Sequence, residues 1–166
     1  MDEVDMRPEK KVVRMLAKHS LSLGTAESCT GGLVAGCITR VPGASECFEG
    51  GFITYSNTAK DRLIGVPREL IEKYGAVSAE TARAMAEGAR ERLGTDMAVA
   101  VTGIAGPTGG TADKPVGTVY IAVARKGATG VRKFQFTGTR HAIRRQTTEE
   151  ALQFVFDEIR ALTGEV

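Results

Sequence analysis

The stretch Thr25-Ala26-Glu27-Ser28-Cys29-Thr30-Gly31-Gly32 joins two patterns that together indicate the fold. Residues 21–27 predict a short strand that runs into this stretch. Apolar residues then recur at helical spacing until Pro42 and Gly43 end the helix: Leu33, Val34, Cys37, Ile38 and Val41. Strands that alternate with helices are typical of α/β proteins. The polar stretch therefore lies where a strand ends and a helix begins.

Helices and strands alternate along the rest of the chain. Further helices are expected over residues 8–20, 57–64, 67–75, 78–94 and 139–162. Asn57 and Ser78 are the expected N-caps of two of them, because their side chains can accept hydrogen bonds from free backbone N–H groups. The last helix is expected to bury one apolar stripe: Leu152, Val155, Ile159 and Leu162.

Four further segments have strand character. Residues 52–55 predict one strand, and the unbroken apolar runs 97–101 and 118–124 predict central strands that are buried on both faces. Two sets of side chains alternate along residues 131–137, as in a strand, and a glycine-containing turn separates this segment from the run before it. This pattern predicts an antiparallel hairpin at the sheet edge. The sequence thus predicts an α/β fold, a three-layer α/β/α sandwich with a mixed, mostly parallel sheet. No linker or repeat interrupts it, so one domain is expected over residues 1–166.

Composition narrows the class of protein. A net charge of +2 gives no support for binding nucleic acid. Three cysteines without a C-x-x-C pair predict neither a disulfide framework nor a zinc site, and the acidic residues are dispersed, so no metal and no cofactor is expected. The charged first residues do not resemble a signal peptide, and no apolar run approaches the roughly 18 residues of a membrane span. A cytoplasmic protein without a membrane partner is expected.

The opening stretch can bind or react with a ligand. Ligands of open α/β sheets gather at the carboxyl ends of strands, beside helix N-termini that attract anions. Gly31 and Gly32 let a ligand approach the backbone, and Ser28 or Thr30 can direct a hydroxyl group at it. The alternative is that one hydroxyl only caps the helix while the glycines form the turn. The stretch does not match the G-x-S-x-G pattern of α/β-hydrolases.

A second glycine-rich segment, residues 102–110, directly follows the apolar run 97–101. Its composition favours a binding loop that includes Thr102, Gly103 and Gly106, although a long connection can also be merely mobile. It matches neither the nucleoside triphosphate loop nor the dinucleotide-binding pattern.

A serine nucleophile needs a base, and the two histidines, His19 and His141, are poorly placed on helices. The segment 54–60 offers Tyr55 and Lys60 instead, if burial or a neighbouring cation lowers the pKa. Taken singly, Tyr55 is more simply explained as a half-buried aromatic residue of the sheet, and Lys60 as a solvated cation on a helix.

Two arginines, Arg140 and Arg144, lie four residues apart at the start of the last helix. Such a pair can bind a phosphate group, although surface helices carry many arginines without a binding role.

The ordered set of motifs resembles the C-terminal domain of the CinA family, the PncC-type nicotinamide mononucleotide deamidases. The set is T-A-E-S-C-T-G-G, G-G-F-I-T-Y-S-N-x-x-K, V-T-G-I-A-G-P followed by K-P-V-G-T-V, and R-x-x-I-R, and it spans about residues 8–162. The resemblance implies an amidohydrolase that converts nicotinamide mononucleotide to nicotinate mononucleotide and ammonia. Many family members carry an upstream domain with pyrophosphatase activity, which this chain is not expected to have.

The resemblance also implies roles for individual residues. Ser28 is similar to the nucleophile, and Tyr55 and Lys60 to the groups that activate it and move protons. The implied substrate-binding residues are Cys29, Thr30, Gly31, Gly32, Asn57, Thr102, Gly103, Gly106, Arg140 and Arg144. The expected partner is a small-molecule mononucleotide, and the expected assembly is a homo-oligomer, a dimer or higher. Two alternatives remain: a non-catalytic nucleotide-binding or regulatory module linked to competence, and a hydrolase of another small amide.

Overall fold

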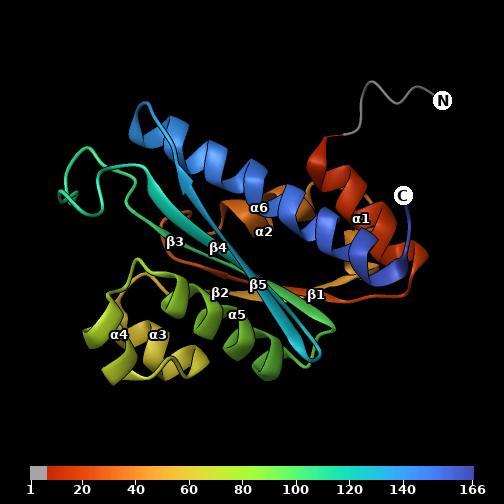
Figure 1. Cartoon of the computed structure of the whole chain (residues 1–166). Coiled ribbons are helices and arrows are strands. Elements are labelled where there is room, and N and C mark those ends of the chain that lie inside the picture. Colours follow the sequence, from red (N-terminus) through yellow and green to blue (C-terminus); the bar gives the residue numbers. More distant parts are fainter. Residues whose placement is uncertain (1–6) are drawn as a thin grey trace.

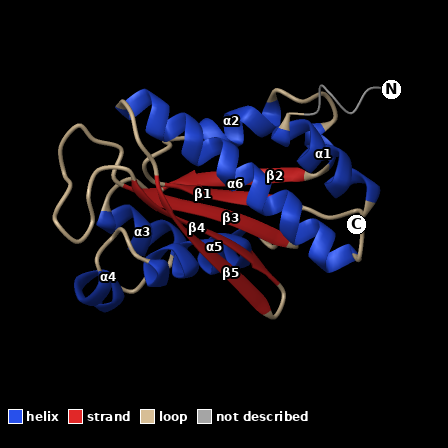
Figure 2. Ribbon diagram, turned by 45° about the horizontal axis from the view of Figure 1, so that its top comes forward, coloured by secondary structure: helices blue, strands red, loops and turns tan. Residues whose placement is uncertain are grey.

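A computed structural model of the chain describes residues 7–166 and shows one sheet between two layers of helices (Figures 1 and 2). Helices α1, α2 and α6 cover one face of the sheet, and α3, α4 and α5 cover the other. The charged first residues, from which the absence of a signal peptide is predicted, lie mostly outside the described part. The elements are α1 Pro8–Lys18, β1 Leu23–Glu27, α2 Leu33–Thr39, the 3-10 helix η2 Ala44–Glu46, β2 Phe48–Ile53, α3 Asn57–Ile64, α4 Arg68–Tyr74, α5 Ala79–Leu93, β3 Met97–Gly103, β4 Thr118–Arg125, β5 Ala128–Gln135 and α6 Arg140–Thr163.

The sheet has the strand order β2-β1-β3-β4-β5. Strand β1 pairs in parallel with β2 and with β3, whereas β4 is antiparallel to both β3 and β5. The predicted mixed sheet and edge hairpin are therefore confirmed, but the parallel part is confined to three strands. The physical reason is the connection between β3 and β4, which holds no crossover helix and so returns the chain in the opposite direction.

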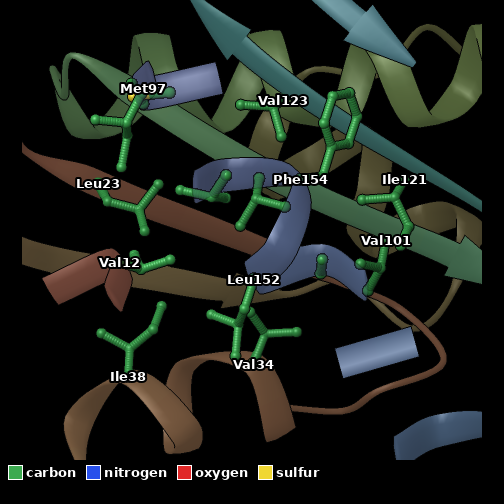
Figure 3. Packing of buried hydrophobic residues seen from close by; sticks show 14 of the residues in the cluster. Val12, Leu23, Val34, Ile38, Met97, Val101, Ile121, Val123, Leu152 and Phe154 are labelled. Atoms are coloured by element: carbon green, nitrogen blue, oxygen red, sulfur yellow. The ribbon is translucent and has the colours of Figure 1, made fainter. Parts of the chain in front are cut away.

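The two faces of the sheet are packed differently. Large aliphatic side chains fill the core under α1, α2 and α6, among them Val12, Val34 and Leu152 (Figure 3). Alanines dominate the core under α5 and the neighbouring helices: Ala26, Ala82, Ala86, Ala89, Ala98, Ala100, Ala122 and Ala124. Small side chains on both the helix and the sheet let α5 approach the strands closely.

Several local expectations need correction. Strand β2 begins at Phe48 and ends at Ile53, four residues earlier and two residues earlier than predicted. Ser56, and not Asn57, caps α3, because its Oγ accepts a hydrogen bond from the Ala59 N–H at 3.0 Å. Leu162 is 43% exposed, since the buried stripe of α6 ends at Ile159. The Ser78 cap of α5 is confirmed.

Candidate active site

Ser28 follows the last residue of β1 and is anchored to the sheet. Its backbone N–H donates to the Val101 carbonyl oxygen of β3 at 3.1 Å. The next residues turn sharply, and Gly31 and Gly32 adopt φ values of 57° and 109° there. Side chains with a Cβ rarely adopt these conformations, which explains the glycine pair. The serine hydroxyl is therefore held at the junction of strand and helix that the sequence predicts.

A buried carboxylate, Glu27, holds this turn from the inside. Its oxygens accept hydrogen bonds from Thr30 Oγ1 at 2.6 Å, from the Val34 N–H at 2.8 Å and from the Ala35 N–H at 3.1 Å. Glu27 thus satisfies free N–H groups at the start of α2. The Thr30 hydroxyl is used within this network, and its side chain is fully buried. Sequence analysis missed this role of Glu27, although an acidic residue just before a helix start is a usable signal.

The amine of Lys60 contacts the Ser28 hydroxyl. Its Nζ lies 3.0 Å from Ser28 Oγ, and it donates to the carbonyl oxygen of Thr54 at 2.8 Å and to that of Tyr55 at 3.2 Å. Lys60 lies in the first turn of α3 and only 1% of its surface is exposed. The structure thus brings together two of the residues that were singled out as catalytic.

Burial lowers the pKa of Lys60 from 10.5 to about 8. The desolvated site disfavours the ammonium form, so much of the amine is neutral near pH 8. A neutral amine has two N–H groups and one lone pair. The two carbonyl oxygens match the N–H groups, which leaves the lone pair for the Ser28 O–H. In this geometry a neutral amine can accept the proton of the Ser28 hydroxyl.

Ser28 and Lys60 border a cavity of about 190 Å³. It is lined by Ser28, Cys29, Tyr55, Lys60, Ala76, Val77, Thr102, Gly103, Ala105 and Arg140. The residues come from the ends of β1, β2 and β3, from α3, from the connection before α5 and from the start of α6. The carboxyl ends of parallel neighbouring strands thus form the site, as in other open α/β sheets.

Tyr55 and Arg140 form the rim of this cavity. One guanidinium nitrogen of Arg140 donates to the Tyr55 hydroxyl at 3.1 Å and the other donates to the Gly106 carbonyl oxygen at 2.7 Å. Tyr55 is 62% exposed. The two candidate bases are therefore separated: Lys60 contacts Ser28 inside the cavity, whereas the Tyr55 hydroxyl contacts Arg140 at the entrance.

Cys29, beside Ser28, is a second potential nucleophile in the cavity wall. Burial raises the pKa of its thiol to about 11. Because the thiolate is the reactive form, the protonated Cys29 competes poorly with Ser28. Thr102, which also lines the cavity, donates its hydroxyl to the Ala76 carbonyl oxygen at 2.8 Å. It joins β3 to the segment that precedes α5.

Some residues that the resemblance implies in substrate binding do not line the cavity. Asn57 is exposed in the first turn of α3. Gly31 and Gly32 shape the turn behind Ser28. Arg144 donates through Nε to the Cys29 carbonyl oxygen and through Nη2 to the Thr30 carbonyl oxygen, each at 3.0 Å. Their assignment to substrate stays a prediction.

Arg144 also borders a second cavity of about 560 Å³ between α1, α2 and α6. His141 lines it too, and His19 at the end of α1 contacts Glu165. Residues 7–166 hold no group of three or more acidic, cysteine or histidine side chains arranged to bind a metal ion. Within the same range, no helix combines the length and apolar character needed to cross a membrane.

Comparison with known proteins identifies the family. The family model for the CinA C-terminal domain matches residues 5–159. The chain belongs to the CinA C-terminal domain family. A CinA-like protein from Geobacter sulfurreducens is 52% identical over 153 residues, which are 92% of this chain and 37% of the relative. A CinA-like protein from Akkermansia muciniphila is 51% identical with the same coverage, so the chain spans just over a third of these relatives.

Solved structures of CinA proteins share the fold. The competence/damage inducible protein CihA from Agrobacterium tumefaciens superimposes with a TM-score of 0.88 at 41% identity, over 95% of this chain and 98% of that chain. A CinA superfamily protein from Klebsiella pneumoniae gives a TM-score of 0.90 at 30% identity, over 93% and 96%. The α/β architecture that was predicted from the sequence is therefore that of the CinA family.

Proposed function

We propose that this CinA-type domain is a serine-dependent amidohydrolase that converts nicotinamide mononucleotide to nicotinate mononucleotide and ammonia. The observation that carries the proposal is the buried contact between Lys60 Nζ and Ser28 Oγ at the wall of an open cavity. A lysine with a lowered pKa beside a serine hydroxyl is an arrangement that serves acyl transfer.

The proposed reaction runs through an acyl-enzyme. Neutral Lys60 takes the proton of the Ser28 hydroxyl, and the Ser28 oxygen bonds to the carboxamide carbon. The C–N bond then breaks, and the protonated Lys60 gives its proton to the leaving nitrogen, so that ammonia departs. Water repeats the sequence with Lys60 as base, which releases the carboxylate and restores Ser28.

The developing oxyanion needs donors close to Ser28. Cys29, the residue after the nucleophile, lines the cavity. Among the hydrogen bonds of residues 7–166, none has the Cys29 backbone N–H as its donor to another residue. We assign this N–H group to the oxyanion, as in other acyl-transfer enzymes.

The cavity size supports binding of the reactive end of the substrate. Its 190 Å³ is below the roughly 300–1,000 Å³ of pockets that enclose a drug-sized ligand. In the proposed complex the carboxamide and its ring occupy the cavity, and the ribose and phosphate extend past the rim. Arg140 lies at that rim and offers a guanidinium for the phosphate.

The same cavity size favours a second candidate, hydrolysis of a smaller amide without a phosphate. A third function, a regulatory role linked to competence, is suggested by the name of the Agrobacterium protein and would not require the Ser28–Lys60 contact.

Ammonia release from a panel of amides separates these candidates. Nicotinamide mononucleotide, nicotinamide riboside, nicotinamide and glutamine are compared with the parent protein and with Ser28→Ala as the blank. We expect the mononucleotide to have the highest kcat/KM. A higher kcat/KM for a phosphate-free amide would mean that this amide is the better candidate substrate. If no amide releases ammonia, the regulatory role is favoured.

A further inference from the structure

Arg144 reaches from the second turn of α6 to the turn that carries Ser28. Its guanidinium bridges two consecutive carbonyl groups, those of Cys29 and Thr30, at 3.0 Å each. It also lies close to Gly31, where an added Cβ would be 3.5 Å from Arg144 Nη2. A charged, planar donor that bridges neighbouring carbonyls fixes their relative orientation.

These carbonyl groups belong to the two peptides that follow Cys29 and Thr30. In the described chain only the Gly106–Pro107 bond is cis, so both peptides are trans and each N–H points away from its own carbonyl. The peptide between Thr30 and Gly31 shows the consequence. Its carbonyl oxygen accepts from Arg144, and its N–H donates to the Ser28 carbonyl oxygen at 3.1 Å. A continuous series of hydrogen bonds therefore connects Arg144 to the residue that carries the nucleophile.

We propose that Arg144 is a positioning residue, which holds the Ser28 turn in its reactive geometry and does not bind the substrate. The inference rests on the proposed function in one respect, that Ser28 is the nucleophile. It departs from the sequence-based expectation that Arg140 and Arg144 bind a phosphate together. Arg140 borders the catalytic cavity, whereas Arg144 borders the second cavity on the helical side of the turn.

The next residue of α6 supplies a matched control. Arg145 is an arginine of the same helix and borders the same second cavity, but it pairs with Glu149 at 3.0 Å and is 57% exposed. Replacing Arg145 removes an equal charge from the same region without touching the Ser28 turn. Arg144→Lys is the conservative variant, because an ammonium keeps the charge but lacks the fork that bridges two carbonyls.

The first test compares kinetics of Arg144→Ala, Arg144→Lys and Arg145→Ala on nicotinamide mononucleotide and nicotinamide riboside. We expect kcat of Arg144→Ala to fall about 10- to 100-fold on both, with KM and the preference between the two substrates unchanged. Arg144→Lys should lie between Arg144→Ala and the parent, and Arg145→Ala should match the parent. A loss confined to the mononucleotide, through KM, would make Arg144 a phosphate ligand and overturn the inference.

The second test does not depend on the substrate. A fluorophosphonate reacts with activated serines, and its rate of Ser28 labelling, followed by mass spectrometry, reports the nucleophile alone. We expect Arg144→Ala to label more slowly than Arg145→Ala by a similar factor. Millimolar guanidinium should restore part of the rate in Arg144→Ala but not in Arg144→Lys, because the vacated site opens to the 560 Å³ cavity.

The outcomes separate the two proposals. If the parent releases no ammonia from any amide, yet Arg144→Ala slows labelling, the proposed function fails and the positioning role stands. If a folded Arg144→Ala, checked by thermal melting, labels and turns over like the parent, the positioning role is wrong. If Arg144→Ala does not fold, Arg144→Lys decides: a parent-like labelling rate overturns the inference and a slower rate supports it.

Discussion

The segments 25–32 and 102–110 include the ends of the neighbouring parallel strands β1 and β3 and have similar compositions, yet they differ in how they are held. The first is almost wholly enclosed: Glu27 and Thr30 are buried, and Arg144 binds its carbonyl groups from outside. The second becomes exposed after Gly106, and residues 107–113 extend into solvent.

This difference separates two tasks. A nucleophile must be fixed within a fraction of an ångström relative to its base, which requires the bonded turn after β1. A cavity wall needs only shape, and the end of β3 with the residues after it supplies this shape through Thr102, Gly103 and Ala105. Substitutions in the first segment should therefore change the chemical step, and those in the second should change access and stability.

The largest effect is expected for Ser28→Ala. Removal of the hydroxyl should lower kcat by at least about a thousandfold, because no other activated nucleophile borders the cavity. The thermal midpoint should remain close to the parent, since the backbone bond to Val101 persists. Mass spectrometry of the parent with a slow substrate should show an acyl group on Ser28. Substantial turnover by Ser28→Ala would refute the covalent route.

Lys60→Met should cost almost as much activity and also remove a pH dependence. The base must be neutral, so the parent kcat should rise with pH through about 8 and then level off. Stability should follow the same group. The unfolded chain keeps its proton up to about 10.5, so the free energy of unfolding of the parent should rise between pH 8 and pH 10.5. Denaturation of Lys60→Met across that window should lack this rise, and an unchanged profile would mean that another group titrates.

Arg140→Ala should have an intermediate effect that depends on the substrate. Loss of a charged hydrogen bond of roughly 1.5–3 kcal/mol would lower kcat/KM for the mononucleotide by about one to two decades. The riboside, which lacks the phosphate, should be hardly affected. Equal losses on both substrates would mean that Arg140 contacts the carboxamide instead. If activity is unchanged, Arg140 is a surface residue without a role in substrate binding.

The smallest effects should come from a pair of glycine substitutions, one in each segment. Gly31 and Gly109 both have positive φ, 57° and 91°, so alanine should strain either position by about 1–2 kcal/mol. Both variants should melt at a lower temperature. Only Gly31→Ala should lower kcat, because the strain at Gly31 falls in the turn that carries Ser28, whereas Gly109 lies in the exposed part of the second segment. Equal kcat values would show that the turn tolerates displacement.

Most of the fold could be predicted from local sequence patterns. The cap at Ser78 and the apolar run of β3 are encoded within a few residues, and both were predicted. The early start of β2 at Phe48 was not predicted, because the glycine pair Gly50-Gly51 resembles a turn. In the structure, a Cβ on Gly51 would lie 2.0 Å from Thr25 Oγ1, so the glycine serves the close approach of two strands. Nothing near Gly51 in the sequence reveals that distant neighbour.

The site was predicted as a set of residues but not as an arrangement. Ser28 and Lys60 are 32 positions apart, and no spacing rule implies that their side chains touch. The different contacts of Arg140 and Arg144 likewise depend on the tertiary structure. Both lie at the start of α6, and only the position of the Ser28 turn decides that Arg144 binds the backbone of this turn while Arg140 binds the Gly106 carbonyl group.

The alanine-rich face under α5 makes the volume of the cavity adjustable from a distance. Helix α5 rests on Ala98 and Ala100, and the connection just before it carries Ala76 and Val77 in the cavity wall. Larger side chains beneath the helix should therefore move that wall relative to Ser28. Substitutions under α5 are therefore a way to enlarge the cavity for bulkier amides without changing any of the proposed reacting groups.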